Sequence, residues 1–213
     1  MGITERRERE RQEMRELILT AAMQLFTEES FEATTMRRIA DKIEYTPGTI
    51  YGYFKDKNEI LFALHERGFD ELVDAQRKAL EGVVDPDDRL TAIARAYMGF
   101  ALDNPGQYDL MFIDRATGET IAAEQRWDSG LCGYKILRDV VVEVLAKHRL
   151  DLHPDVGAFA CWSFVHGMVS LRIRNRCVMY PAEQLPQIMH LSNEFFLLLL
   201  KGQAHQHYAL PVA

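Results

Sequence analysis

Apolar residues recur at helical spacing along almost the whole chain, and the alternating pattern typical of strands is almost absent. In the first such stretch, apolar side chains fall at i, i+3, i+4 and i+7 without a gap. The pattern predicts an all-α fold of about nine helices joined by short loops. The expected helices cover residues 8–28, 35–43, 46–54, 56–80, 87–102, 108–113, 119–148, 155–177 and 181–201. Thr117-Gly118 is expected to form a loop, and the helix after it could bend near residues 129–130.

Two short helices joined by a tight turn stand out in the segment TTMRRIADKIEYTPGTIYGYFKDK, residues 34–57. A threonine at the start of the first helix can cap it, and Thr46 followed by Pro47 suits the start of the second. Ala40 is small where the two helices must cross. The apolar positions are spaced to be buried together against the preceding helix: Ile39, Ile43, Ile50 and Phe54.

This arrangement is that of a helix-turn-helix, in which the first helix braces the second. The second helix would then expose hydroxyl and aromatic side chains that suit phosphates and base edges. A helical hairpin inside a larger bundle would produce the same periodicity, so the pattern alone leaves both interpretations open. The residues expected on the exposed side are Thr46, Gly48, Thr49, Tyr51, Gly52 and Tyr53.

Over about residues 12–65, the chain resembles the N-terminal DNA-binding domain of TetR-family transcriptional regulators. A weaker resemblance, at Trp162, His166 and Gly167, is to the Trp-His-Gly signature of one group of TetR-type C-terminal domains. The residues that carry the main resemblance are Ala21, Ala22, Leu25, Phe26, Thr35, Arg37, Ile39, Ala40, Thr46, Gly48, Thr49, Ile50, Tyr51, Tyr53, Phe54, Lys57 and Leu61.

The resemblance implies roles for individual residues. Thr35 and Tyr51 would bind phosphates, Arg37 would reach a base or a phosphate, and Lys57 would grip the DNA backbone. Thr46, Gly48, Thr49 and Tyr53 lie where family members approach bases. The chain departs from the family in the turn, where Glu44 replaces the usual glycine and Tyr45 a small aliphatic residue. A non-glycine residue with positive φ costs about 1 kcal/mol or more.

The charge distribution argues against a broadly basic nucleic-acid surface. The net charge is −7, and residues 1–60 hold ten basic and twelve acidic side chains. Any DNA contact must therefore come from a local patch. Four arginines alternate with glutamates at the start of the chain, which fits either a solvated, salt-bridged helix or an arm that reaches the DNA backbone. They are Arg6, Arg7, Arg9 and Arg11.

The last predicted helix is apolar on all sides at residues 195–200, so it should be covered on two sides. A second subunit is the expected cover, with Phe195 and Leu198 in the interface. The resemblance implies the same, since helices 155–177 and 181–201 of two subunits would form a four-helix interface. Burial within a single subunit is the alternative.

The C-terminal part also holds many large side chains, for which core packing is the ordinary explanation. Regulators of the resembled type hold a mostly apolar small-molecule pocket in this part. His166 lies on an otherwise uncharged stretch and would be either a polar group of that pocket or a hydrogen-bonded core histidine. The candidate pocket residues are Tyr97, Phe100, Trp127, Tyr134, Trp162 and His166.

Together these features predict a helix-turn-helix DNA-binding domain at residues 1–58 and a ligand-binding and dimerisation domain at 59–213. The expected function is that of a homodimeric transcriptional repressor, released from a palindromic double-stranded DNA operator by a small apolar or aromatic molecule. The competing classes are an all-α enzyme and an adaptor that does not bind DNA. No phosphate loop, HExxH or nucleophile elbow appears, so neither catalytic residues, nor a metal, nor a cofactor are expected.

The expected compartment is the cytoplasm, without a membrane association. The first residues lack the apolar run of a secretory signal, and three cysteines without CxxC spacing fit a reducing environment. The uncharged run from Val156 to Leu171 has 16 residues and includes a histidine, which is short for a membrane span.

Overall fold

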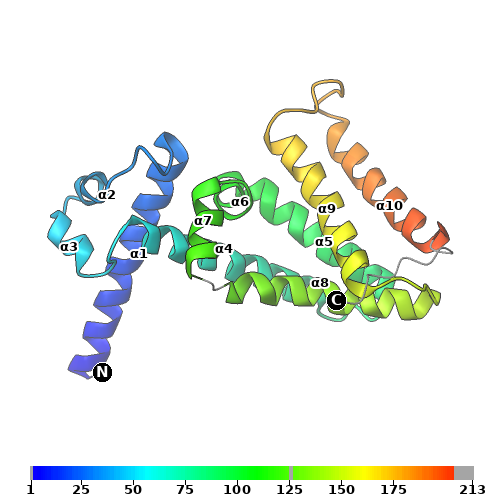
Figure 1. The fold of residues 1–213 in the computed structure, drawn as a ribbon, viewed down its shortest axis with the longest axis horizontal. Helices are drawn as coiled ribbons and strands as arrows, with labels where there is room; N and C mark the ends of the chain where they lie inside the picture. The colour runs from blue at the N-terminus through cyan, green and yellow to red at the C-terminus, as the bar shows by residue number, and fades with distance from the viewer. Residues whose placement is uncertain (1, 125–126, 204–213) are drawn as a thin grey trace. The chain divides into compact units, whose positions relative to one another are not determined.

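The computed structural model describes residues 2–124 and 127–203, and within these residues the fold is entirely helical (Figure 1). The predicted all-α class is therefore confirmed. Ten helices are present in this part of the chain: α1 (Ile3–Glu29), α2 (Met36–Lys42), α3 (Pro47–Tyr51), α4 (Lys57–Leu80), α5 (Pro86–Asp103), α6 (Pro105–Phe112), α7 (Arg115–Glu124), α8 (Asp128–His148), α9 (Pro154–Ile173) and α10 (Leu185–Gln203).

The tenth helix arises where one long helix was expected at residues 119–148. The structure has two helices there, since α7 ends at Glu124 and α8 begins at Asp128. The predicted loop at Thr117-Gly118 is wrong, because both residues lie inside α7. The chain turns earlier, at Asp114, whose carboxylate accepts a hydrogen bond from the Ala116 amide at 2.8 Å and so caps the new helix.

The chain divides into two compact units. The first contains residues 1–68 and 106–127, and the second contains residues 69–105 and 128–213. Helix α4 contributes its first half to one unit and its second half to the other. The first unit thus extends ten residues past the predicted boundary at 58 and also includes α6 and α7, which follow α5 in the sequence.

The core of the first unit joins α1, α2, α3 and the start of α4. Ile18 and Ala22 of α1 are fully buried together with Ile39 of α2 and Ile50 of α3. Phe54, just after α3, is also buried, as the spacing predicted, while Ile43 is only partly buried. This packing fixes the angle between the two short helices and determines which of their sides remains exposed.

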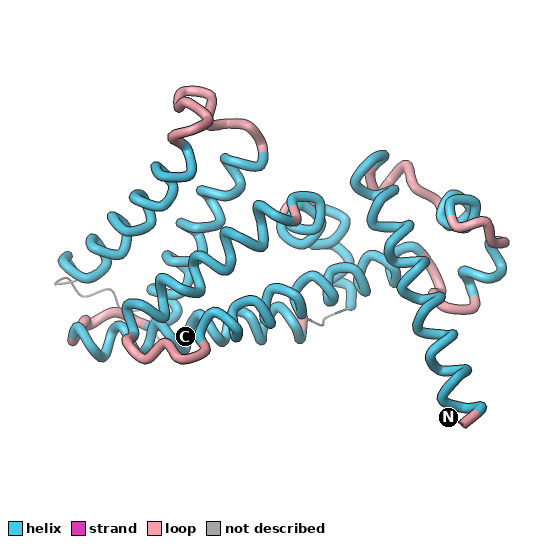
Figure 2. The backbone as a smooth tube through the Cα atoms, turned by 180° about the vertical axis from the view of Figure 1, so that it is seen from behind, coloured by secondary structure: helices cyan, strands magenta, loops and turns pink. Residues whose placement is uncertain are grey.

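The core of the second unit lies between α5, α8 and α9, with α10 packed beside α9 (Figure 2). Branched side chains such as Ile93, Val140 and Val144 fill it. The Phe164 and Phe196 rings stack at 4.3 Å and hold α10 against α9. Helix α9 has 20 residues, and an 18-residue window of it has a mean hydropathy of 1.3, so by length and composition alone it could span a membrane, contrary to the expectation from the sequence. Core helices pass the same test, and one side of α9 is buried in this unit.

Candidate functional site

The turn between α2 and α3 has the backbone of a Schellman motif. The Tyr45 amide donates to the Ala40 carbonyl at 3.0 Å, and the Glu44 amide donates to the Asp41 carbonyl at 3.2 Å. This pattern needs a left-handed residue directly after the helix, which is usually glycine. Glu44 occupies that position with φ of 61°, so the turn keeps its geometry despite the substitution expected to perturb it.

Helix α3 projects a small, polar surface. Thr46 has the extended backbone of an N-cap and Pro47 opens the helix as predicted, but the Thr46 hydroxyl lies 3.2 Å from the Thr49 hydroxyl instead of capping a backbone amide. Of the six residues expected to be exposed, four are and two are half-buried. The exposed residues are Thr46, Gly48, Tyr51 and Gly52, and the half-buried ones are Thr49 and Tyr53.

Gly48 is notable because the fold itself does not require a glycine there. A Cβ at this position would meet only the Thr46 hydroxyl, at 3.7 Å, which is an ordinary contact. A residue without a side chain on an exposed recognition surface allows another molecule to approach the backbone closely.

Helix α2 carries the predicted phosphate-binding residues Thr35 and Arg37. The Thr35 hydroxyl accepts a hydrogen bond from the Arg38 amide at 3.2 Å, which confirms it as the N-cap. Arg37 is exposed and pairs loosely with Asp41 at 3.9 Å. The other two cations of α2 pair with carboxylates at the end of α1, Arg38 with Glu29 and Lys42 with Glu28. Exposed pairs are weak, so a phosphate can displace these carboxylates.

Lys57, predicted to grip the DNA backbone, contacts several groups of its own unit. Its ammonium group donates to the carbonyls of Thr34 at 2.8 Å, of Glu32 at 3.4 Å and of Phe31, and it lies 4.1 Å from the centroid of the Phe31 ring. Desolvation by burial lowers the pKa of Lys57, although the nearby Glu32 carboxylate opposes the shift. The three donors of the ammonium group are thus occupied by the loop that leads into α2.

The structure brings together three of the six candidate effector residues. The Tyr97 hydroxyl lies 3.0 Å from Nδ1 of His166, and the Trp162 and His166 rings meet edge to face at 6.0 Å. Burial, and next the charge of Arg174, lower the pKa of His166, so the imidazole is neutral near pH 7. Phe100 is buried one turn after Tyr97 on α5, and Tyr134 on α8 packs against the core of the same unit.

Trp127 belongs to the first unit, and the other five candidates belong to the second. Its indole N–H donates to Nε2 of His65 at 3.3 Å, and the His65 side chain is fully buried. Desolvation by burial lowers the pKa of His65 to about 4. His65 was not predictable from the sequence, because a single histidine on a helix gives no signal of its burial.

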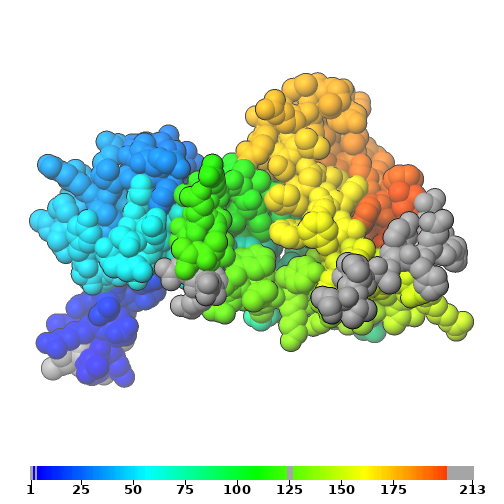
Figure 3. All heavy atoms as spheres, in the orientation of Figure 1, coloured from blue at the N-terminus to red at the C-terminus, as the bar shows by residue number. Residues whose placement is uncertain are grey.

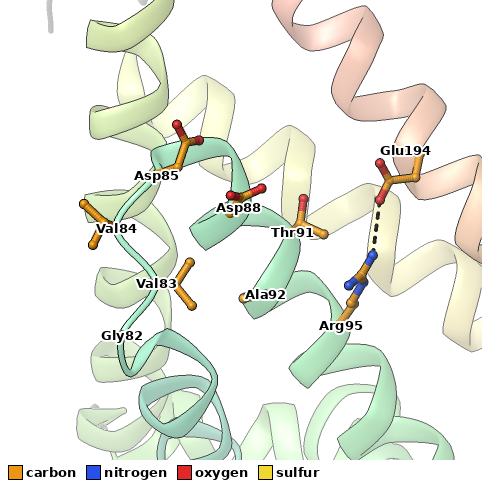
Figure 4. Close-up of a pocket in the computed structure, with 9 residues that line it drawn as sticks. All are labelled: Gly82, Val83, Val84, Asp85, Asp88, Thr91, Ala92, Arg95 and Glu194. Atoms are coloured by element: carbon orange, nitrogen blue, oxygen red, sulfur yellow. Dashed lines mark ion pairs between the residues drawn. The ribbon is translucent and has the colours of Figure 1, made fainter.

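The second unit has a pocket of about 680 Å³ beside the α4–α5 loop, shown in Figure 4. None of the six candidate effector residues is among the described residues that line it. Its lining is largely polar, and Arg95 of α5 pairs with Glu194 of α10 at 3.6 Å (Figure 4). It therefore differs in character from the apolar pocket that the sequence predicted.

Several large apolar residues of α9 and α10 are left exposed. The predicted interface residues Phe195 and Leu198 are 60% and 65% exposed. The side of α10 that faces its own unit is buried at Asn193 and Leu197, so the helix is covered on one side only. Other exposed apolar residues of the two helices are Phe159, Leu171, Leu191 and Leu199.

These features define a helix-turn-helix regulator with a separate helical C-terminal unit. The family model of bacterial regulatory proteins of the tetR family matches residues 18–64, and the model of the tetracyclin repressor-like C-terminal domain matches residues 90–189. The chain therefore belongs to the TetR family, with its N-terminal helix-turn-helix and a TetR-like C-terminal domain.

Two curated relatives illustrate the match. The HTH-type transcriptional activator FasR of Mycolicibacterium smegmatis is 31% identical over 145 residues, which are 67% of this chain and 64% of that protein. The HTH-type transcriptional regulator HbdR of Aromatoleum sp. is 35% identical over 86 residues, 40% of this chain and 38% of that protein. The chain thus matches less than two thirds of the length of either relative.

Solved structures share the fold at low sequence identity. The fatty acid degradation regulator FadR from Bacillus halodurans has a TM-score of 0.70 and 16% identity, over 91% of this chain and 97% of that one. FadR from Bacillus subtilis, solved in complex with stearoyl-CoA, has a TM-score of 0.69 and 15% identity, over 89% and 98% of the two chains.

Proposed function

We propose that this protein is a dimeric, DNA-binding transcriptional repressor of the cytoplasm, released from a palindromic operator by a small apolar or aromatic molecule. The exposed surface of α3 is the observation that carries the proposal. It presents hydroxyls, an exposed tyrosine and a glycine that the fold does not need, on a helix held by a fully packed core. Such a surface suits the major groove, where close approach and hydrogen bonds to base edges give specificity.

The exposed apolar residues of α9 and α10 support the dimer. Monomeric proteins rarely leave a large contiguous apolar patch in water, and a second copy offers the same patch in return. A two-fold dimer presents two equal recognition helices, so it would bind half-sites one DNA turn apart, about 34–36 Å, or a multiple of this spacing.

The cluster of Tyr97, Trp162 and His166 supports control by a ligand. It combines aromatic surface with a hydrogen-bonded, neutral imidazole, which suits an apolar molecule bearing one polar group. The proposed Trp-His-Gly assignment of the C-terminal domain rests on Trp162 and His166 of this cluster together with Gly167. A ligand releases the operator only if it binds the DNA-free conformation more tightly. By linkage, DNA then weakens the ligand by the same factor, typically 5- to 150-fold.

The alternative function is a helical adaptor or enzyme whose helix-turn-helix does not bind DNA. The ion pairs of the α2 cations favour it, because they leave a nearly neutral surface around α3. The exposed Gly48 favours DNA binding, since an adaptor has no evident use for a glycine there.

Gly48→Ala tests the two functions directly. On an exposed helix, alanine raises stability by up to about 1 kcal/mol over glycine, so the variant should fold at least as well as the native chain. If α3 enters the groove, the added methyl group should reduce affinity for upstream DNA in a gel shift by tenfold or more. Gly118→Ala, at another helical glycine with open space around it, is the matched control and should bind normally. Unchanged binding by Gly48→Ala would favour the adaptor or enzyme.

The ligand and the sign of regulation need a second experiment. A transcription assay on the bound promoter, with a panel of aromatic and acyl compounds including an acyl-CoA, should show repression relieved by one class of compound. Because FasR is named an activator, increased transcription on binding would replace the repressor assignment and leave DNA binding in place.

A further inference from the structure

The N-terminal part of α1 is a helix without a core beneath it. Residues 4–13 are all exposed, and burial begins only with Met14 and Ile18. The segment extends away from the rest of the first unit as the dark blue end of the chain in Figure 3. Local contacts stabilise this helical segment. The Gly2 amide donates a hydrogen bond to the Glu5 carboxylate at 2.9 Å, and Arg6 and Glu10 form an ion pair at 3.3 Å. These contacts maintain the helix but do not explain why it is there.

The arginines of this segment fall on different sides of the helix. The Arg15 guanidinium lies 4.3 Å from the centroid of the Phe54 ring, and that of Arg11 lies 6.0 Å from the Tyr53 ring. Both rings lie two to three residues after the end of α3, the proposed recognition helix. Arg7 lies one turn before Arg11, and four residues advance about 40° around a helix, so these three side chains form one row about 12 Å long.

The segment is neutral overall, but this row is not. Within residues 5–16 there are five arginines and five glutamates. At about 100° per residue, four of the glutamates project roughly 100° or more away from Arg11, and only Glu8 lies nearer. In the part of the chain that the structure describes, Arg7, Arg11 and Arg15 have no carboxylate partner, whereas Arg6 on the other side does.

We propose that the row Arg7, Arg11 and Arg15 binds the phosphate backbone of duplex DNA that flanks the segment read by α3. The row starts beside the end of α3 and continues outward, so DNA held by α3 would pass along it. Stacking on an aromatic ring leaves the edge of a guanidinium free to donate to phosphate oxygens. Twelve ångströms correspond to about three to four base pairs of one strand. This inference rests on the proposed DNA binding by α3.

The test compares two double variants of equal charge. Arg7→Gln with Arg11→Gln removes two cations from the row, and Arg6→Gln with Arg9→Gln removes two from the opposite side. Each is measured by fluorescence anisotropy against salt, on a duplex with about ten flanking base pairs on each side and on the same duplex trimmed to its core. All four positions are exposed, so both variants should melt like the native protein.

Each phosphate contact contributes about 0.9 to the slope of log affinity against log salt. Loss of two contacts per subunit should therefore lower the slope on the long duplex by about 3.6 per dimer. Between 50 and 200 mM salt the native protein would then lose roughly 150-fold more affinity than the row variant. On the trimmed duplex the two should agree, and the opposite-side variant should behave like the native protein on both.

Equal effects of the two double variants would overturn the inference, because only net charge would then matter. An unchanged slope for the row variant would overturn it as well, while native binding to the trimmed duplex would still uphold the proposed function. If the native protein binds neither duplex, the proposed function fails first, and the inference fails with it.

Discussion

Comparing Glu44→Gly with Glu44→Gln separates two effects of this glutamate, the strain of its backbone and the negative charge of its side chain. Glu44 holds a left-handed φ of 61° directly after Ile43, the C-cap of α2, where the Schellman hydrogen bonds require it. A side chain in this conformation clashes with its own carbonyl and costs about 1–2 kcal/mol. Its carboxylate is also an exposed negative charge between the two helices of the proposed DNA-binding unit.

The net gain in stability is smaller than the relieved strain. Glycine makes the unfolded chain more flexible, which costs about 0.5–1 kcal/mol. The difference predicts that Glu44→Gly stabilises the fold by about 0.5–1 kcal/mol, or a rise in Tm of roughly 1–4 °C. Differential scanning calorimetry at fixed protein concentration would measure it. Glu44→Gln, which keeps the strain and loses the charge, should melt like the native protein.

DNA affinity, unlike stability, should respond in the same way to both variants. Both variants remove the same charge, so both should bind DNA about twofold more tightly per subunit at low salt, with the difference fading as salt rises. Equal melting temperatures for the Gly and Gln variants would refute the strain argument. Unequal DNA affinities of the two would show that the backbone of the turn, and not the charge, sets binding.

The remaining predictions concern the other parts of the molecule. Leu198→Glu should leave the subunit folded but weaken the dimer by roughly 100-fold or more in sedimentation, since a charge would enter an apolar interface; Leu197→Glu, a change in the core, should unfold the chain instead. Lys57→Met should lower Tm with little change in the salt slope of DNA binding, because its ammonium holds loop carbonyls; a slope reduced by about 1 at unchanged Tm would instead identify a phosphate contact. The pKa of His65, about 4 when folded against about 6.5 unfolded, means that folding favours the neutral ring. The contribution of neutral His65 to the free energy of unfolding should therefore be present in full above about pH 6.5. The free energy of unfolding should fall on the order of 1–2 kcal/mol between pH 7 and pH 5, with a change in Trp127 fluorescence. A free energy of unfolding that does not change over this range would contradict the burial of His65 as a neutral ring. Burial raises the pKa of Cys161 to about 12, so its thiol should resist alkylation in the native protein at pH 8 and react once unfolded.

The helix-turn-helix was predictable because its signals are local. The cap at Thr35, Pro47 at the start of α3 and the spacing of Ile39 and Ile50 each act within a few residues of chain. The strain at Glu44 followed from the resemblance, because family members usually have glycine at this position of the turn.

The contacts that sequence reasoning missed join distant residues. The carbonyl partners of Lys57 lie 23 to 26 residues away, and Trp127 and His65 are 62 residues apart. The sequence suggested a DNA contact for Lys57 and a place in an effector pocket for Trp127. Only the three-dimensional fold shows which groups these two side chains contact. At the start of α7, the Thr117-Gly118 pair was misleading because the cap at Asp114 sets the turn three residues earlier.

In-vitro selection of random duplex DNA by the full chain tests the central claim most directly. The account predicts enrichment of one two-fold symmetric sequence, with half-sites about one helical turn apart or a multiple of it. Tyr53→Ala or Thr49→Ala should change which bases are enriched while the symmetry is kept, because these residues are proposed to approach bases. Enrichment of no sequence, with weak binding that is equal on all duplexes, would contradict the claim that α3 reads DNA.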